Sequence, residues 1–274
     1  MAQNLGTALV TGASSGIGAV YADRLARRGH DLILVARNAA QLEALASRLR
    51  AEFGRAVDVL PADLTDPVQL ATVAERIAAE GNLTLLVNNA GIALDGTLAT
   101  TSASEVSKLI ALNVTAPTLL AQAALKAFQS KGAGQSKGAG GIINIASVLA
   151  LAPEIMEGVY SGSKAFLLNL TQGLAHELGP DSAIRVQAVL PGVTHTEIWE
   201  RSGKDVNAFP ADWVMAVDDL VDAALLGLDR GETVTIPPLA DEAGWTALND
   251  ARLALAPKLS RRDVAPRYRT GADA

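Results

Sequence analysis

Short apolar runs alternate with segments of helical spacing along most of this chain. Apolar residues recur three and four positions apart over 20–28, 39–53 and 67–79, a spacing that predicts amphipathic helices. The apolar runs between such segments are short and punctuated by turn residues, as buried strands are. They occupy 5–10, 31–36, 56–61, 83–87, 141–147, 183–190 and 233–236.

This alternation predicts the fold class. Largely apolar strands separated by helices are typical of a parallel sheet that is covered on both faces. We therefore expect an α/β protein, a single Rossmann-type domain over 1–274 whose doubly wound parallel sheet has about seven strands. In such a sheet ligands bind at the carboxyl ends of the strands, so residues that directly follow a strand are the first candidates for a site.

The composition permits this fold and excludes several functional classes. With 274 residues, 49% of them hydrophobic, the chain can bury one large core. It has no cysteine and only three scattered histidines, so we expect neither disulfides nor a metal site. A net charge of -6 argues against nucleic acid or an anionic membrane as a partner. The chain shows no basic and apolar leader and no uninterrupted apolar span of membrane length, so we expect a cytoplasmic protein.

Three glycines follow the first apolar run, in the sequence Thr11-Gly12-Ala13-Ser14-Ser15-Gly16-Ile17-Gly18. Gly12 permits a sharp turn out of the strand, Gly16 lets backbone N–H groups approach a pyrophosphate, and Gly18 lets the next helix pack closely on the sheet. The spacing differs from the common G-x-G-x-x-G. A tight strand-to-helix turn without a ligand is the alternative explanation.

Tyr160 and Lys164 stand four residues apart in a segment of helical character, so both side chains should project from one face. An ammonium close to a tyrosine favours the phenolate, and lowering a tyrosine pKa from about 10 toward 7 takes roughly 4 kcal/mol. A tyrosine tuned in this way can exchange a proton with a carbonyl or alcohol oxygen at neutral pH. A chance pair on a solvated helix is the alternative.

Seven motifs, in order along 5–236, resemble those of the short-chain dehydrogenase/reductase family in its compact branch. They are Thr11 to Gly18, Asn88-Asn89-Ala90-Gly91, Asn113, Ser147, Tyr160, Lys164 and Pro191-Gly192. The resemblance implies an NAD(P)-dependent oxidoreductase that transfers a hydride reversibly between nicotinamide and a ketone or secondary alcohol of medium size. A small carbonyl or alcohol compound is thus the expected substrate.

The resemblance also assigns roles to individual residues. Tyr160 is the general acid/base, Lys164 lowers its pKa and holds the nicotinamide ribose, and Ser147 hydrogen-bonds the substrate oxygen. Asn113 holds a water that continues the proton path, with an ordinary polar helix residue as the alternative. The residues expected to bind the cofactor are Gly12, Ser14, Ser15, Gly16, Ile17, Gly18, Arg37, Asp63, Leu64, Asn89, Ala90, Gly91, Tyr160, Lys164, Pro191, Gly192, Val193 and Thr196.

The end of the second apolar run bears on which nicotinamide cofactor is used. An acidic residue there would bind the ribose 2′-hydroxyl of NAD, but the chain has Ala36 followed by Arg37. A guanidinium can pair with a 2′-phosphate, so we expect NADP(H) in preference to NAD(H). Ser14 and Ser15 stand where many NADP-dependent relatives carry a second basic residue. Asp63 resembles the family's adenine contact, and a helix cap is its alternative.

The substrate side is less clearly marked. Ser147, Leu149 and Trp199 are expected to contact the substrate, and 193–216 is expected to form a lid over an apolar pocket, with a surface helix as the alternative. The segment 237–274 is a C-terminal extension outside the family motifs. The resemblance implies a homo-oligomer, either a dimer or a tetramer, because relatives are commonly tetramers. The candidate contacts are Phe166, Leu167 and Leu170, with plain core residues as the alternative.

Two other functions fit parts of the sequence. A non-catalytic protein of the same fold would sense the nicotinamide redox state, although it would not need Ser147, Tyr160 and Lys164. Gly12 to Gly16 also satisfies G-x-S-x-G, the nucleophile elbow of serine hydrolases. That elbow normally follows several strands, whereas this one follows the first, so a hydrolase is a remote alternative.

Overall fold

The computed structural model describes residues 4–130, 139–155, 158–198, 203 and 205–269. The chain divides into two compact units, Met1–Pro238 and Leu239–Ala274. The second unit contains α9 (Ala243–Leu255) and two 3-10 turns, η6 (Ala256–Lys258) and η7 (Pro266–Tyr268), and none of its described residues is buried. The first unit holds the sheet and the predicted motifs.

The sheet has seven parallel strands in the order β3-β2-β1-β4-β5-β6-β7, so the predicted doubly wound parallel sheet is confirmed. The chain builds outward from β1 to β3, returns to the other side of β1, and builds outward again. The strand order therefore reverses between β1 and β4, the place where such sheets bind ligands. The strands are β1 (Thr7–Thr11), β2 (Asp31–Ala36), β3 (Val57–Pro61), β4 (Leu83–Asn88), β5 (Gly140–Ile145), β6 (Ile184–Val189) and β7 (Val234–Thr235).

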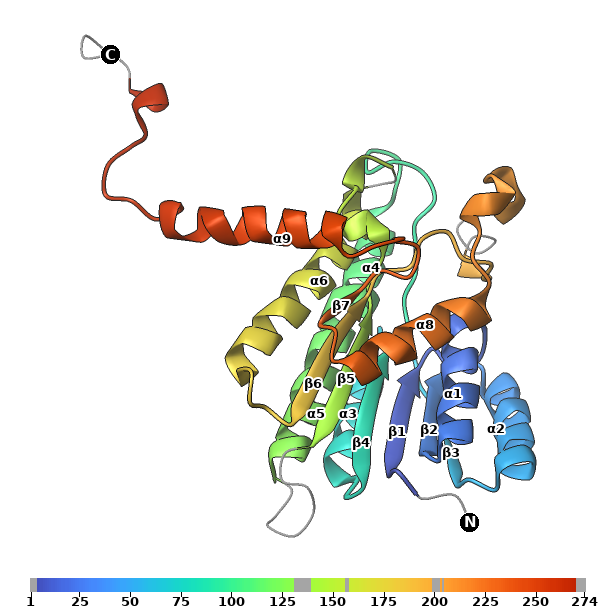
Figure 1. Cartoon of the computed structure of the whole chain (residues 1–274). Helices are drawn as coiled ribbons and strands as arrows, with labels where there is room; N and C mark the ends of the chain where they lie inside the picture. The colour runs from blue at the N-terminus through green and yellow to red at the C-terminus, as the bar shows by residue number, and fades with distance from the viewer. Residues whose placement is uncertain (1–3, 131–138, 156–157, 199–202, 204, 270–274) are drawn as a thin grey trace. The chain divides into compact units, whose positions relative to one another are not determined.

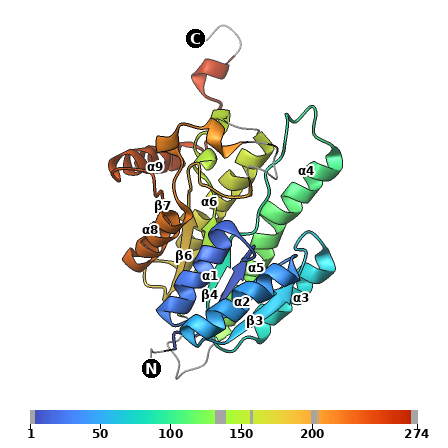
Figure 2. The same cartoon turned by 90° about the vertical axis from the view of Figure 1, so that its right-hand side faces the viewer.

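Helices cover both faces of the sheet because successive strand residues point to opposite faces. Val10 and Leu34 belong to one buried cluster, whereas their neighbours Leu9 and Ile33 belong to the other. In Figure 1, α1 and α8 lie side by side on the first face, and Figure 2 shows α2 next to α1. The first face carries α1 (Gly16–Arg28), α2 (Ala39–Phe53) and α8 (Val217–Arg230), and the second carries α3 (Pro67–Ala79), α5 (Ala116–Ser130) and α6 (Gly158–Leu178).

Local capping explains why two helices have the predicted bounds. The Asn38 side chain accepts a hydrogen bond at the start of α2, and Gly54, with a φ of 64°, ends that helix in the left-handed conformation. Asp66 caps α3 in the same way, with Pro67 in its first turn. Prediction was less accurate at α1, which begins at Gly16 instead of residue 20 because the glycine loop turns directly into the helix.

A continuous helical segment, Ala103–Ser130, comprises α4 (Ala103–Ile110), the π-helical turn η1 (Ala111–Thr115) and α5. By length and composition alone this helix is long and apolar enough to span a membrane, although Asn113, Gln122 and Lys126 interrupt its apolar residues. In this fold it is a core helix. Its buried residues Leu120, Ala124 and Phe128 pack in the cluster on the second face of the sheet.

Candidate functional site

Tyr160 and Lys164 lie one turn apart on α6, and the Lys164 Nζ is 5.5 Å from the centroid of the Tyr160 ring. Ser147 follows β5 and caps the 3-10 turn η2 (Val148–Ala150). All three side chains are buried, yet each lines one large cavity. The pairing of β5 with its neighbours and the packing of α6 against η2 therefore bring together residues that the sequence separates.

The Lys164 ammonium is hydrogen-bonded to the end of a strand of the sheet. Its Nζ donates a hydrogen bond of 2.8 Å to the carbonyl oxygen of Ile145, the last residue of β5. Burial lowers the pKa of Lys164 to about 8, because the charged form is poorly solvated there. A cation beside the tyrosine ring favours the phenolate, so the arrangement suits proton exchange at Tyr160.

Ser147 is oriented by its own turn. Its Oγ accepts a hydrogen bond of 3.2 Å from the Leu149 N–H, which fixes the oxygen at the cavity wall. Among the described residues no acceptor takes the Ser147 hydroxyl proton. The hydroxyl is therefore free to donate to an oxygen placed in the cavity.

Asn113 lies in η1 and is 1% exposed. Its Oδ1 accepts from the Ile92 N–H at 2.9 Å, and its Nδ2 donates to the Ile92 carbonyl at 2.8 Å and to the Ser163 Oγ at 3.2 Å. The side chain thus ties the loop after β4 to α6, one residue before Lys164. Asn113 does not itself line the cavity, but a Cβ added on Gly91, which does line it, would lie 3.3 Å from the Asn113 Oδ1.

The glycine loop is built for a close approach by a ligand. Gly12 and Gly16 have φ values of 66° and 53°, which favour glycine, and a Cβ on Gly12 would lie 2.8 Å from the Asn89 amide. Asn89 Nδ2 donates to the carbonyls of Thr11 and Gly12 at 2.9 and 3.2 Å. Gly18 does not line the cavity; a Cβ there would strike the Gly12 carbonyl. Small residues thus hold the β1 loop, the β4 loop and α1 tightly together.

Arg37 and Asp63, which follow β2 and β3, both line the cavity. Burial tends to raise the pKa of Asp63, but hydrogen bonds from Thr65 and the attraction of Arg37 and Lys108 outweigh it and lower the pKa. Asp63 does not cap α3, because Asp66 does so. Lys108, on α4, lines the cavity and was not predicted, since nothing in the sequence distinguishes it from a solvated helix lysine.

The segment after β6 also contributes to the cavity wall. The Met215 N–H donates to the Val193 carbonyl at 2.9 Å, and the His195 N–H donates to the Met215 carbonyl at 3.3 Å. The 3-10 turns η4 (Val206–Ala208) and η5 (Ala211–Trp213) lie between Val193 and Met215 in the chain. The apolar residues of this segment that line the cavity are Ile198, Phe209, Trp213, Val214 and Met215.

Nearly all the predicted site residues surround one cavity of about 1380 Å³. Trp199, which was expected to contact the substrate, lies outside the described residues. Among the described residues that line the cavity there is no histidine. The predicted residues along it are Gly12, Ser14, Ser15, Gly16, Ile17, Arg37, Asp63, Leu64, Asn89, Ala90, Gly91, Ser147, Leu149, Tyr160, Lys164, Pro191, Gly192, Val193 and Thr196.

Comparison with known proteins identifies matches over most of the chain. A family model for short chain dehydrogenases matches residues 6–207. The 3-oxoacyl-[acyl-carrier-protein] reductase of Escherichia coli is 32% identical over 83% of this chain and 92% of its own length. Human 17-beta-hydroxysteroid dehydrogenase type 3 is 31% identical over 75% of this chain, which spans 64% of the human enzyme's length.

Two solved structures extend the similarity to nearly the whole chain. A short-chain dehydrogenase from Sphingobium yanoikuyae in complex with NADPH is 52% identical, with a TM-score of 0.91 and coverage of 97% of this chain and 100% of that one. A bulky-bulky ketone specific alcohol dehydrogenase from Comamonas testosteroni is 45% identical, with a TM-score of 0.86 and coverage of 97% and 99%.

Proposed function

Because this chain belongs to the short-chain dehydrogenase/reductase family and is therefore a nicotinamide-dependent oxidoreductase, we propose that it interconverts ketones and secondary alcohols, with NADP(H) preferred and Tyr160 as general acid/base. The observation that carries the proposal is the shared cavity of Ser147, Tyr160 and Lys164, with the Lys164 Nζ 5.5 Å from the Tyr160 ring.

The cavity fits a dinucleotide. Positive φ at Gly12 and Gly16 and the crowding around a Cβ on Gly12 leave a cradle that only small residues provide. We assign Gly12 to Ile17 to the pyrophosphate, Asp63 and Leu64 to the adenine, and Pro191 to Val193 with Thr196 to the carboxamide. When bound, the nicotinamide supplies or accepts the hydride.

In the reducing direction Tyr160 gives its hydroxyl proton to the ketone oxygen, and Ser147 donates a hydrogen bond to that oxygen as negative charge develops on it. Lys164 stabilises the phenolate that remains and holds the nicotinamide ribose. Asn113 holds a water that continues the proton path and returns a proton to Tyr160. Each of these steps runs in reverse for alcohol oxidation.

We propose a ketone with bulky apolar substituents as the substrate. Leu149, which packs in one cluster with Tyr160, lines the cavity together with the apolar residues Ile155, Phe209 and Trp213. The related Comamonas protein is described as specific for bulky-bulky ketones. The segment 193–216, which carries Phe209 and Trp213, is the proposed lid.

The preference for NADP(H) rests on charge at the adenosine end. Arg37 is exposed at the end of β2 and lines the cavity, and the position before it is Ala36 in place of a carboxylate. The related Sphingobium structure contains NADPH.

We further propose a cytoplasmic homo-oligomer, a dimer or tetramer. Phe166 contributes to the contact because it is 38% exposed on α6, while Leu167 is buried.

The decisive experiment compares wild type with Tyr160→Phe on a panel of bulky ketones with NADPH. The variant should lose a factor of roughly 10² to 10⁴ in kcat because the proton donor is gone, while its Kd for NADPH stays within twofold. Unchanged turnover would refute the mechanism. Absence of turnover in wild type with tight NADPH binding would favour the redox sensor instead. An esterase activity that Ser14→Ala abolishes would favour the hydrolase.

A further inference from the structure

The helices α1 and α8 both begin at the wall of the cavity. Gly16 and Ile17 line it at the start of α1, and Ala216 and Asp219 line it at the start of α8. The two helices pack against each other on the same face of the sheet. Their separation therefore sets the distance between the glycine loop and the proposed lid.

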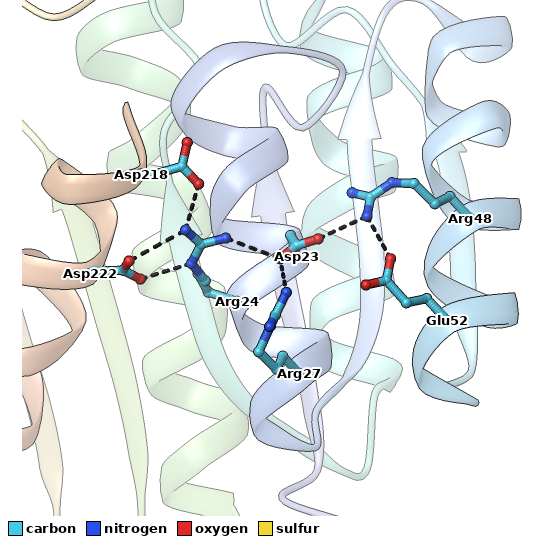
Figure 3. A network of polar contacts seen from close by, with 7 residues as sticks. All are labelled: Asp23, Arg24, Arg27, Arg48, Glu52, Asp218 and Asp222. Atoms are coloured by element: carbon cyan, nitrogen blue, oxygen red, sulfur yellow. Dashed lines mark hydrogen bonds and ion pairs between the residues drawn. The ribbon is translucent and has the colours of Figure 1, made fainter. Parts of the chain in front are cut away.

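Arg24 connects these helices through two carboxylates of α8, as Figure 3 shows. Its Nε donates to the Asp222 Oδ1 at 2.8 Å and its Nη2 to the Asp222 Oδ2 at 3.3 Å, a two-pronged contact. The same Nη2 donates to Asp218, one turn nearer the cavity. A planar guanidinium held at three oxygens fixes direction as well as distance.

Arg24 is also hydrogen-bonded to Asp23 of its own helix, which links it to α2. Its Nη1 donates to Asp23 at 3.2 Å, and Asp23 is in turn 2.9 Å from Arg48 on α2. Arg48 also pairs with Glu52 at 2.9 Å. The Asp23 and Arg24 side chains are 12% and 21% exposed, so the centre of the network is largely buried, whereas its Asp218 and Asp222 partners on α8 are 63% and 56% exposed. Several linked charges hold more firmly than an isolated surface pair.

The network ends beside the lid. Asp218 lies two residues after Ala216, the N-cap residue of α8, which makes no side-chain cap hydrogen bond. Immediately before it, Met215 exchanges backbone hydrogen bonds with the segment after β6, through Val193 and His195. A displacement of the first turn of α8 would therefore move both Met215 and Val193, which line the cavity.

We propose that Arg24 is a positioning residue for substrate selection: by fixing the first turn of α8 against α1 it sets the place of the lid's base at Val193 and Met215. The inference rests on the proposed function, because it assigns this wall to the substrate side. Arg24 itself touches neither substrate nor cofactor, and it does not line the cavity.

The molecule provides a matched control. Arg28 also joins α1 to α8, through Asp229 at 3.0 Å, but at the far end of α8, and neither residue lines the cavity. Arg24→Ala thus removes the ion pairs with Asp218 and Asp222, and Arg28→Ala removes the ion pair with Asp229, between the same two helices. Only the first lies next to the lid.

The test measures kcat and KM for a bulky ketone at saturating NADPH in both variants and in Arg24→Lys, together with hydrogen exchange of the amides of residues 214–220. We expect Arg24→Ala to lower kcat/KM about tenfold, mainly through KM, because the substrate-side wall shifts. Exchange at 214–220 should accelerate, Arg24→Lys should recover part of both losses, and Arg28→Ala should stay within twofold of wild type.

Equal effects of Arg24→Ala and Arg28→Ala on kcat/KM and on exchange would overturn the inference while leaving the proposed function intact. If wild type reduces no ketone, the proposed function fails, and the exchange comparison still decides whether Arg24 holds the lid's base. If Arg24→Ala does not fold, Asp222→Asn replaces it, with Asp229→Asn as its control and the same outcomes deciding.

Discussion

The Ser15 hydroxyl donates a hydrogen bond of 3.0 Å to the Glu197 carboxylate, so the glycine loop and the segment after β6 touch at the rim of the cavity. The two residues are 182 positions apart in the chain. A carboxylate at this place faces the loop that we assign to the pyrophosphate. Cofactor binding must therefore either displace Glu197 or tolerate its charge.

We predict that Glu197→Gln binds NADPH about two- to fivefold more tightly than wild type, because it removes a negative charge near the phosphates and retains an acceptor for Ser15. A fluorescence titration of the apo proteins measures the Kd. Glu177→Gln, which neutralises an exposed glutamate at the end of α6, is the charge control and should not change it. Equal tightening in both variants would show that net charge alone is responsible.

Arg37→Ala should weaken NADPH by roughly 10- to 100-fold, the cost of losing charged hydrogen bonds to a phosphate. NADH, which has no 2′-phosphate, should change by less than twofold. Titrations with both cofactors give the ratio. Lys126→Ala removes an exposed lysine of α5 and serves as the control. If Arg37→Ala weakens both cofactors alike, Arg37 is not the selector.

Lys164 should make the stability of the apo protein depend on pH. Its pKa is about 8 in the folded protein and 10.5 unperturbed, so between these values the unfolded chain binds more protons and the free energy of unfolding rises with pH. The contribution of Lys164 to the free energy of unfolding is complete above pH 10.5 and is lost as the pH falls through 8. Relative to Lys164→Met, wild type should gain up to about 3 kcal/mol from pH 8 to 10.5, measured by urea unfolding. Parallel pH profiles would contradict this.

A buried hydrogen bond fixes α6 to the sheet below the proposed catalytic residues. Asn144 Nδ2 donates to the Thr171 Oγ1 at 2.9 Å, and both residues are fully buried. Thr171→Val leaves that donor without a partner and should cost about 1 to 3 kcal/mol of stability. Thr171→Ser keeps the hydroxyl and loses only one methyl group, so it should retain most of the stability that Thr171→Val loses. Thermal and urea unfolding provide the measurement, and equal losses would assign the effect to packing.

Sequence reasoning was accurate where local chemistry decides the structure. Residues 31–36, 39–53 and 67–79 form β2, α2 and α3 with the predicted bounds, because caps such as Asn38 and Asp66 and the φ of Gly54 act within a few residues. The predicted bounds were less accurate where one element leads directly into the next. The predicted strand 141–147 ends at Ile145, since Ser147 turns to cap η2.

By itself, the sequence determined the family, the parallel sheet and the residues that follow its strands, since periodicity and motif order are properties of one stretch of chain at a time. The tertiary structure alone decided that Lys108 helps to lower the pKa of Asp63, that Glu197 reaches Ser15 and that Arg24 holds Asp222. Each of these pairs comes from elements far apart in the sequence. In the sequence such charged residues cannot be told from solvent-exposed surface residues. Only the packing of α1, α4 and α8 shows which of them are neighbours.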